Sequence, residues 1–126
     1  NIALRSKVDS GRVFLVTDAM STVGTDQTEF VLNNRQIFRK NGKLTLSDGT
    51  LAGADLDMIS AVRFMMANTD IDMEEALRMA SLYPAQCLGV EATRGGFAKG
   101  NAADIVHLDD GQAVKTVWRL GFKLEV

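Results

Sequence analysis

The stretch Val13-Phe14-Leu15-Val16-Thr17-Asp18-Ala19-Met20 decides the fold. Its four consecutive apolar residues predict a β-strand that is buried on both faces. A helix-like segment over residues 2–8 precedes it, and an all-apolar strand fed by a helix is typical of a parallel sheet covered on both sides. The strand ends at a carboxylate, Asp18, and α/β barrels build their functional sites at the carboxyl ends of their strands. We therefore predict an α/β fold with Asp18 at its functional edge.

The composition is that of a soluble globular domain. The 126 residues are 46% hydrophobic and 24% charged, enough for one domain with a core. The net charge of −2 gives no reason to expect nucleic acid or an anionic membrane as a partner. The longest apolar runs are too short to cross a bilayer, and the first residues of this sequence do not show the pattern expected of a signal peptide. Because residue 1 is Asn rather than Met, we expect that an N-terminal part of the protein can precede it.

The remaining elements follow from turn pairs and periodicity. The pairs Asn33-Asn34, Asn41-Gly42 and Asp48-Gly49 tolerate positive φ, so residues 28–47 predict an antiparallel hairpin or three-stranded meander. Helical spacing predicts helices over 55–68 and 73–82, with Asp55 and Asp57 favouring the N-terminal end of the first through the helix dipole. Asp72 and Glu75 resemble a capping box at the start of the second. A short helix containing Pro84 and ending at Gly89 follows, and then a strand at 103–108 and one or two more strands over 113–119 and 121–125.

Few side chains offer catalytic chemistry. The chain has one His and one Cys, so it cannot supply a usual multi-His or Cys zinc site. We expect His107 to pack or to face solvent on its strand, and Cys87 to be a small buried core residue. The glycines between residues 95 and 100 lack the Gly-Lys-Ser/Thr of a phosphate-binding loop. For Asp18 two interpretations stay open, an ordinary turn residue and a general acid/base.

Two groups of motifs resemble one protein family. Glu75-Ala76-Leu77-Arg78-Met79-Ala80 with Tyr83-Pro84-Ala85, Leu88-Gly89, Gly100 and Ala103-Asp104-Ile105-Val106 is similar to the closing signature of the amidohydrolase superfamily. Val16-Thr17-Asp18-Ala19-Met20 with Gly24, Asn41-Gly42-Lys43 and Asp48-Gly49-Thr50-Leu51-Ala52-Gly53 resembles, more narrowly, its N-acetylglucosamine-6-phosphate deacetylases. The resemblance covers residues 2–124 but only the C-terminal third of such an enzyme.

The resemblance implies a fold and a domain division. Residues 1–92 would be the C-terminal part of a metal-dependent (β/α)8 barrel, namely its last strand and closing helices, with a β-hairpin inserted at about 28–50. Residues 93–126 would be the C-terminal strands of a small β-sandwich domain. A barrel of this type needs roughly 250 residues, so the resemblance implies a missing N-terminal part of the same protein.

The resemblance also implies an activity, which is deacetylation of N-acetylglucosamine 6-phosphate to glucosamine 6-phosphate and acetate. Asp18 would be the general base and then the general acid, and Leu51, Ala52, Gly53 and Ala54 would line the substrate pocket. A divalent metal ion, zinc or iron, would be held by residues before residue 1, so this chain alone should hold no metal and be inactive. The complete enzyme would be a cytoplasmic homodimer acting on a small amino-sugar phosphate, with no nucleic acid or membrane partner.

One departure and two alternatives accompany the resemblance. Many members have Ser where this chain has Ala54, and a Ser there would suit a helix N-cap; Asp55 is expected to compensate. The first alternative function is another amidohydrolase, such as a deaminase or a cyclic-amide hydrolase. The second is a non-catalytic α+β interaction module.

Overall fold

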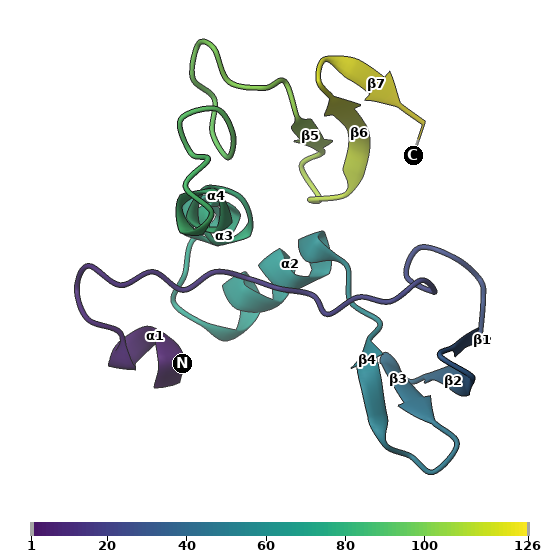
Figure 1. Cartoon of the computed structure of the whole chain (residues 1–126). Helices are drawn as coiled ribbons and strands as arrows, with labels where there is room; N and C mark the ends of the chain where they lie inside the picture. The colour runs from purple at the N-terminus through teal and green to yellow at the C-terminus, as the bar shows by residue number, and fades with distance from the viewer. Residues whose placement is uncertain (1, 126) are drawn as a thin grey trace. The chain divides into compact units, whose positions relative to one another are not determined.

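The structure, a computed structural model, describes residues 2–125. The chain divides into two compact units. One unit is Val16–Ala61, and the other joins the residues up to Leu15 with those from Val62 onward. The elements are helices and two separate antiparallel sheets (Figure 1), so the fold is α/β as predicted.

The first unit is built on a four-stranded antiparallel sheet in the order β1-β2-β3-β4. Its strands are β1 (Glu29–Leu32), β2 (Arg35–Lys40), β3 (Lys43–Leu46) and β4 (Leu51–Ala54). Asn33 and Asn34 both have positive φ, as do Asn41 and Gly42, which is the backbone of the tight turns that join antiparallel strands. The predicted meander over 28–47 is confirmed and gains a fourth strand, because residues 51–54 pair with β3.

The segment 13–17 differs from its prediction. It runs as an extended chain between α1 (Ile2–Ser6) and β1 (Figure 1), but within residues 2–125 it is not paired as a strand. The N–H of Leu15 donates to the carbonyl of Met79 at 2.9 Å, while Phe14 and Val16 are 40% and 71% exposed. A strand is buried on both faces only where strands flank it and layers cover it. Among the described residues, the side chains of Val13, Leu15 and Thr17 are partly covered, while those on the opposite face are exposed.

The predicted helices are confirmed as α2 (Met58–Asn68), α3 (Met73–Ala80) and α4 (Leu82–Cys87). Helix α2 begins three residues later than predicted, because the side chain of Asp57 accepts the N–H of Ser60 at 2.7 Å. The N-cap expected at position 54 or 55 is therefore wrong. The Asp72 side chain caps α3 through the N–H of Glu75 at 2.8 Å, as predicted. No helix in the described part of the chain is long and apolar enough to cross a membrane.

The C-terminal strands form a three-stranded antiparallel sheet in the order β5-β6-β7. They are β5 (Ile105–Leu108), β6 (Val114–Arg119) and β7 (Phe122–Leu124), which confirms the predicted strands. The turn at Leu120 and Gly121 is fastened to the segment before β5. The Gly121 N–H donates to the Ala103 carbonyl at 2.9 Å, and the Leu120 N–H donates to the Asp104 carboxylate at 2.8 Å.

Candidate active site

Asp18 ends the extended segment with a left-handed backbone conformation that is held against β4, and we call this conformation the Asp18 turn. The φ of Asp18 is 52°, and its side chain is exposed. The main-chain N–H of Ala54 donates to the Asp18 carbonyl at 3.0 Å, and Ala19 pairs with Ala54 as a parallel bridge. The N–H of Ala19 also lies 3.3 Å from the Thr17 hydroxyl, which accepts from it. Backbone contacts on both sides therefore fix the residue that bears the candidate carboxylate.

Gly53 lies next to Ala54 on β4, where Met20 and Asp18 leave no room for a side chain. It is buried, and a Cβ added there would lie 2.7 Å from Met20 Sδ, 2.8 Å from Met20 Cγ and 3.2 Å from the Asp18 carbonyl oxygen. The structure thus brings Asp18 together with Gly53 and Ala54, three of the five residues predicted for the site. Leu51 and Ala52 lie at the other end of β4.

Leu51 and Ala52 line an open groove of about 530 Å³ on the β-sheet unit. Polar groups of the β1–β2 turn face it, along with the side chain that packs on Gly53. The lining includes Met20, Asn33, Arg35, Thr50, Leu51 and Ala52. The predicted substrate residues therefore share a groove with a guanidinium and an amide, groups that suit an anionic, hydroxyl-rich ligand. Sequence reasoning treated Asn33 only as a turn residue and did not single out Arg35.

The turn before β4 stabilises the negative charge of Asp48. The Thr50 N–H donates to the Asp48 carboxylate at 2.9 Å, and this bond holds the pKa of Asp48 below its ordinary value. The positive charge of Arg35 acts in the same direction. Arg35 lines the groove, and the anionic Asp48 that it influences lies in the turn directly before Thr50 and β4.

An ion pair braces the loop that follows Asp18. Arg39 Nε lies 2.7 Å from Asp55 Oδ2, and the two side chains are 27% and 14% exposed. Arg39 Nη1 also donates to the Thr25 carbonyl at 2.5 Å. One side chain on β2 thereby joins the loop after Asp18 to the residue after β4.

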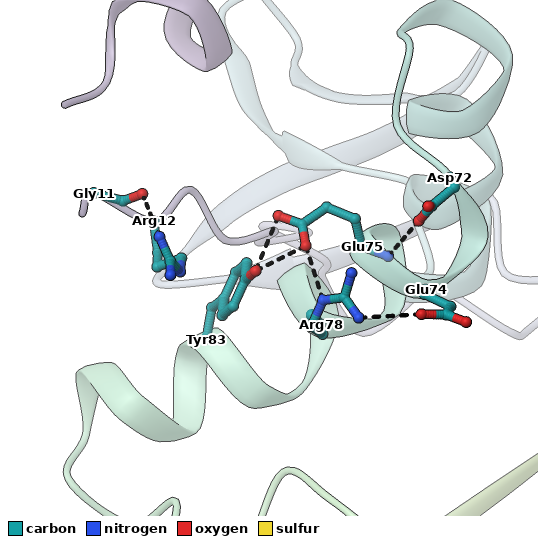
Figure 2. A network of polar contacts seen from close by, with 7 residues as sticks. All are labelled: Gly11, Arg12, Asp72, Glu74, Glu75, Arg78 and Tyr83. Carbon is teal, nitrogen blue, oxygen red and sulfur yellow. Dashed lines mark hydrogen bonds and ion pairs between the residues drawn. The ribbon is translucent and has the colours of Figure 1, made fainter. Parts of the chain in front are cut away.

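A second polar cluster lies on α3 and α4, and sequence reasoning did not find it (Figure 2). Arg78 Nε donates to Glu75 Oε2 at 2.8 Å, and the Tyr83 hydroxyl lies 3.0 and 2.8 Å from the two Glu75 oxygens. The Arg78 bond, aided by Tyr83, lowers the pKa of Glu75. The Arg12 guanidinium lies 5.4 Å from the Tyr83 ring centroid, within cation–π range. The cluster joins the residue before the extended segment to the α3–α4 corner, which is a structural role.

The two other singled-out side chains carry no site. Cys87 is exposed, so its prediction as a buried core residue is wrong; it is the last residue of α4, and its neighbours Gln86 and Leu88 are exposed too. His107 is exposed on β5. Among residues 2–125 no three His, Cys, Asp or Glu side chains are grouped so as to hold a metal ion.

A family model supports the sequence resemblance over almost the whole chain. The model of the amidohydrolase family matches residues 2–123. The chain belongs to the amidohydrolase family. This amidohydrolase chain is 41% identical over 109 residues to N-acetylgalactosamine-6-phosphate deacetylase of Shewanella sp. (strain ANA-3), a match that covers 86% of the chain and 27% of that relative. Members of the family are generally metal-dependent.

Solved amidohydrolase structures match it too. N-acetylglucosamine-6-phosphate deacetylase from Pasteurella multocida is 31% identical with a TM-score of 0.87, over 98% of this chain and 32% of that one. An Asp→Ala variant of the Mycobacterium smegmatis deacetylase, in complex with N-acetyl-D-glucosamine-6-phosphate, is 30% identical with a TM-score of 0.77, over 89% of this chain and 30% of that one. The chain thus spans about a third or less of the length of these relatives.

Proposed function

We propose that this chain forms the C-terminal part of a hydrolase that removes the acetyl group from an N-acetylated amino-sugar 6-phosphate. The observation that carries the proposal is the match to deacetylases of this substrate class, at 41% identity in sequence and a TM-score of 0.87 in structure. In this proposal residues 1–92 complete a (β/α)8 barrel, the sheet at about 28–50 is its insert, and residues 93–126 complete a β-sandwich. The unpaired segment 13–17 would then be a barrel strand.

Asp18 is the proton carrier in the proposed reaction. Its carboxylate takes a proton from a water molecule as the water oxygen bonds to the acetamide carbonyl carbon. When the carbon–nitrogen bond breaks, the same carboxyl group returns that proton to the departing nitrogen. The products are acetate and the free amine, and Asp18 ends in its starting state. The exposed side chain of Asp18 at the end of an extended segment supports this role.

The substrate wall is formed by β4 in the same proposal. Leu51 and Ala52 line the groove, together with Arg35, and Gly53 and Ala54 lie against the Asp18 turn. A divalent metal ion, zinc or iron, would polarise the carbonyl and activate the water. Residues 2–125 group no three His, Cys, Asp or Glu side chains around one point, and in this proposal the metal ligands lie in the remainder of the protein.

The test uses the complete protein, meaning this chain with any sequence that adjoins it in its gene. We expect the complete protein to release acetate from N-acetylglucosamine 6-phosphate, and Asp18→Asn to lower kcat by at least about 10³-fold, since a catalytic acid/base is lost. Asp110→Asn, the same change at an exposed turn residue, is the control. Retained turnover in Asp18→Asn would overturn the role of Asp18, and no acetate release by the unaltered protein would overturn the proposed function.

A second substrate is favoured by one specific observation. The 41% identical relative is an N-acetylgalactosamine-6-phosphate deacetylase, whereas the solved structures are N-acetylglucosamine-6-phosphate deacetylases. The two sugars differ only in configuration at C4, so the ratio of kcat/KM for the two 6-phosphates decides between them. Deaminase and cyclic-amide substrates on the same panel test the other amidohydrolase activities. Sedimentation and cell fractionation test the proposed homodimer and cytoplasmic location.

A further inference from the structure

We propose that Gly53 is a positioning residue for Asp18: the absence of a side chain on β4 lets Met20 pack there, and this packing sets the turn that aims the Asp18 carboxylate. The inference rests on the proposed function, because it assumes that Asp18 moves the proton. It differs from the substrate-wall role that the family resemblance implies for Gly53.

The need for glycine at this position is steric, since Gly53 has no positive φ. A Cβ would lie 2.7 Å from Met20 Sδ and 2.8 Å from Met20 Cγ, well inside the 3.5–4.0 Å at which such atoms attract. It would also lie 3.2 Å from the Asp18 carbonyl oxygen. An alanine at 53 must therefore displace the Met20 side chain, the Asp18 peptide or both.

The Asp18 turn has little freedom to absorb such a displacement without moving its side chain. With φ of 52°, Asp18 occupies a small allowed region that persists where its surroundings hold it. Those surroundings are the Ala54 N–H on the Asp18 carbonyl at 3.0 Å and the Ala19 N–H on Thr17 at 3.3 Å. Gly53 thus sets the Asp18 turn by leaving space for the Met20 side chain, and Ala54 sets it by donating a hydrogen bond to the Asp18 carbonyl.

The test measures kcat and KM of the complete protein in four variants: Gly53→Ala, Met20→Ala, both together, and Gly96→Ala. Gly96 is the matched control, because an added Cβ there meets only Asn101 Nδ2 at 3.9 Å. We expect Gly53→Ala to lower kcat by about 10- to 100-fold with KM within about threefold, as a small misplacement of a reacting group does. Because the Met20 packing sets the turn, Met20→Ala should also lower kcat, and adding Gly53→Ala to it should change kcat by no more than about threefold.

Three results would overturn the inference. The first is a kcat of Gly53→Ala within twofold of that of the unaltered protein. The second is a rise in KM at unchanged kcat, which would assign Gly53 to substrate contact. The third is a fall in kcat on adding Gly53→Ala to Met20→Ala that is as large as the fall in the unaltered protein. If Gly53→Ala alone is insoluble, the double variant decides: activity near that of Met20→Ala supports the inference, and an insoluble or inactive double variant overturns it. Failure of the proposed function is separate, because it appears as no acetate release by the unaltered protein. Failure of the proposed role of Asp18 appears as turnover retained in Asp18→Asn.

Discussion

The main-chain N–H of Ala54 donates a hydrogen bond of 3.0 Å to the carbonyl oxygen of Asp18. This bond joins the end of β4 to a turn whose central residue is in the left-handed region. Asp and Asn tolerate that region better than other residues with a Cβ, and β-branched residues tolerate it least. The position therefore combines a backbone requirement with the candidate catalytic carboxylate.

The backbone requirement can be separated from the chemistry with two substitutions at residue 18. We expect Asp18→Asn to change the free energy of unfolding by less than about 0.5 kcal/mol, and Asp18→Val to lower it by about 1–3 kcal/mol. Urea denaturation of the complete protein measures both. Equal stability of the two variants would contradict the left-handed turn.

The Arg39–Asp55 pair should contribute measurably to stability because it is mostly shielded from water. Asp55→Asn leaves the Arg39 charge without its partner, and we expect a loss of about 1.5–3 kcal/mol in the free energy of unfolding. Glu74→Gln is the control, since its pair with Arg78 spans 3.4 Å and Glu74 is 83% exposed. Exposed pairs contribute about 0–1 kcal/mol. An Asp55→Asn loss no larger than that of Glu74→Gln would show that the pair does not brace the loop.

The sequence was most informative where the chain determines its own geometry. Two turns with positive φ, at Asn33-Asn34 and Asn41-Gly42, determine the meander, and the Asp72 cap determines the start of α3. The prediction failed for Asp55, because either Asp55 or Asp57 can cap a helix and only tertiary structure assigns Asp55 to Arg39. It also failed for the segment 13–17, because burial of a strand depends on neighbours that its own residues do not specify.

Part of the candidate site followed from the family resemblance rather than from residue patterns. Asp18 could be singled out by its place after an apolar run, but a turn aspartate gives the same pattern. The close approach of Gly53 to Met20 joins residues 33 positions apart, and no periodicity marks it. The Glu75–Tyr83 bond likewise spans the break between α3 and α4, so helical spacing within one helix could not indicate it.

The N-cap of α3 offers a local test. We expect Asp72→Ala to destabilise α3 by about 1 kcal/mol, because it removes the acceptor for the Glu75 N–H. Ser81→Ala is the matched change at the start of α4, where the Ser81 side chain makes no cap hydrogen bond. Amide hydrogen exchange in the first turn of each helix measures the effect. If Ser81→Ala increased the exchange rate in α4 by more than Asp72→Ala increased it in α3, the assignment of the cap would be contradicted.

The Glu75 cluster predicts a pH dependence with a definite sign. Because the folded-state pKa of Glu75 is below its ordinary value of 4.5, mainly through Arg78, its stabilisation is fully present above that value. It is lost as the pH falls below 4.5 through the lower folded-state pKa. Glu75→Gln should therefore lower stability at neutral pH, and the difference should shrink in acid. Urea denaturation at several pH values measures this, with Glu74→Gln as the control. A Glu75→Gln difference that is constant with pH would refute the prediction.

Thr22 has a buried hydroxyl, and we expect it to stabilise the fold less than an apolar group of the same shape would. The residue is 0% exposed, and its Oγ1 has no hydrogen-bond partner among the described residues. A buried hydroxyl left unpaired costs about 1–3 kcal/mol, whereas Val has nearly the same shape and no such cost. Its backbone carbonyl, which accepts from the Thr25 N–H at 3.1 Å, is kept in both residues. We therefore expect Thr22→Val to raise the free energy of unfolding by about 1 kcal/mol, measured by urea denaturation. Thr25→Val is the matched control, because the Thr25 hydroxyl donates to the Thr22 carbonyl at 3.0 Å and its loss should destabilise. Destabilisation by Thr22→Val would show that the hydroxyl has a partner, such as a bound water, in solution.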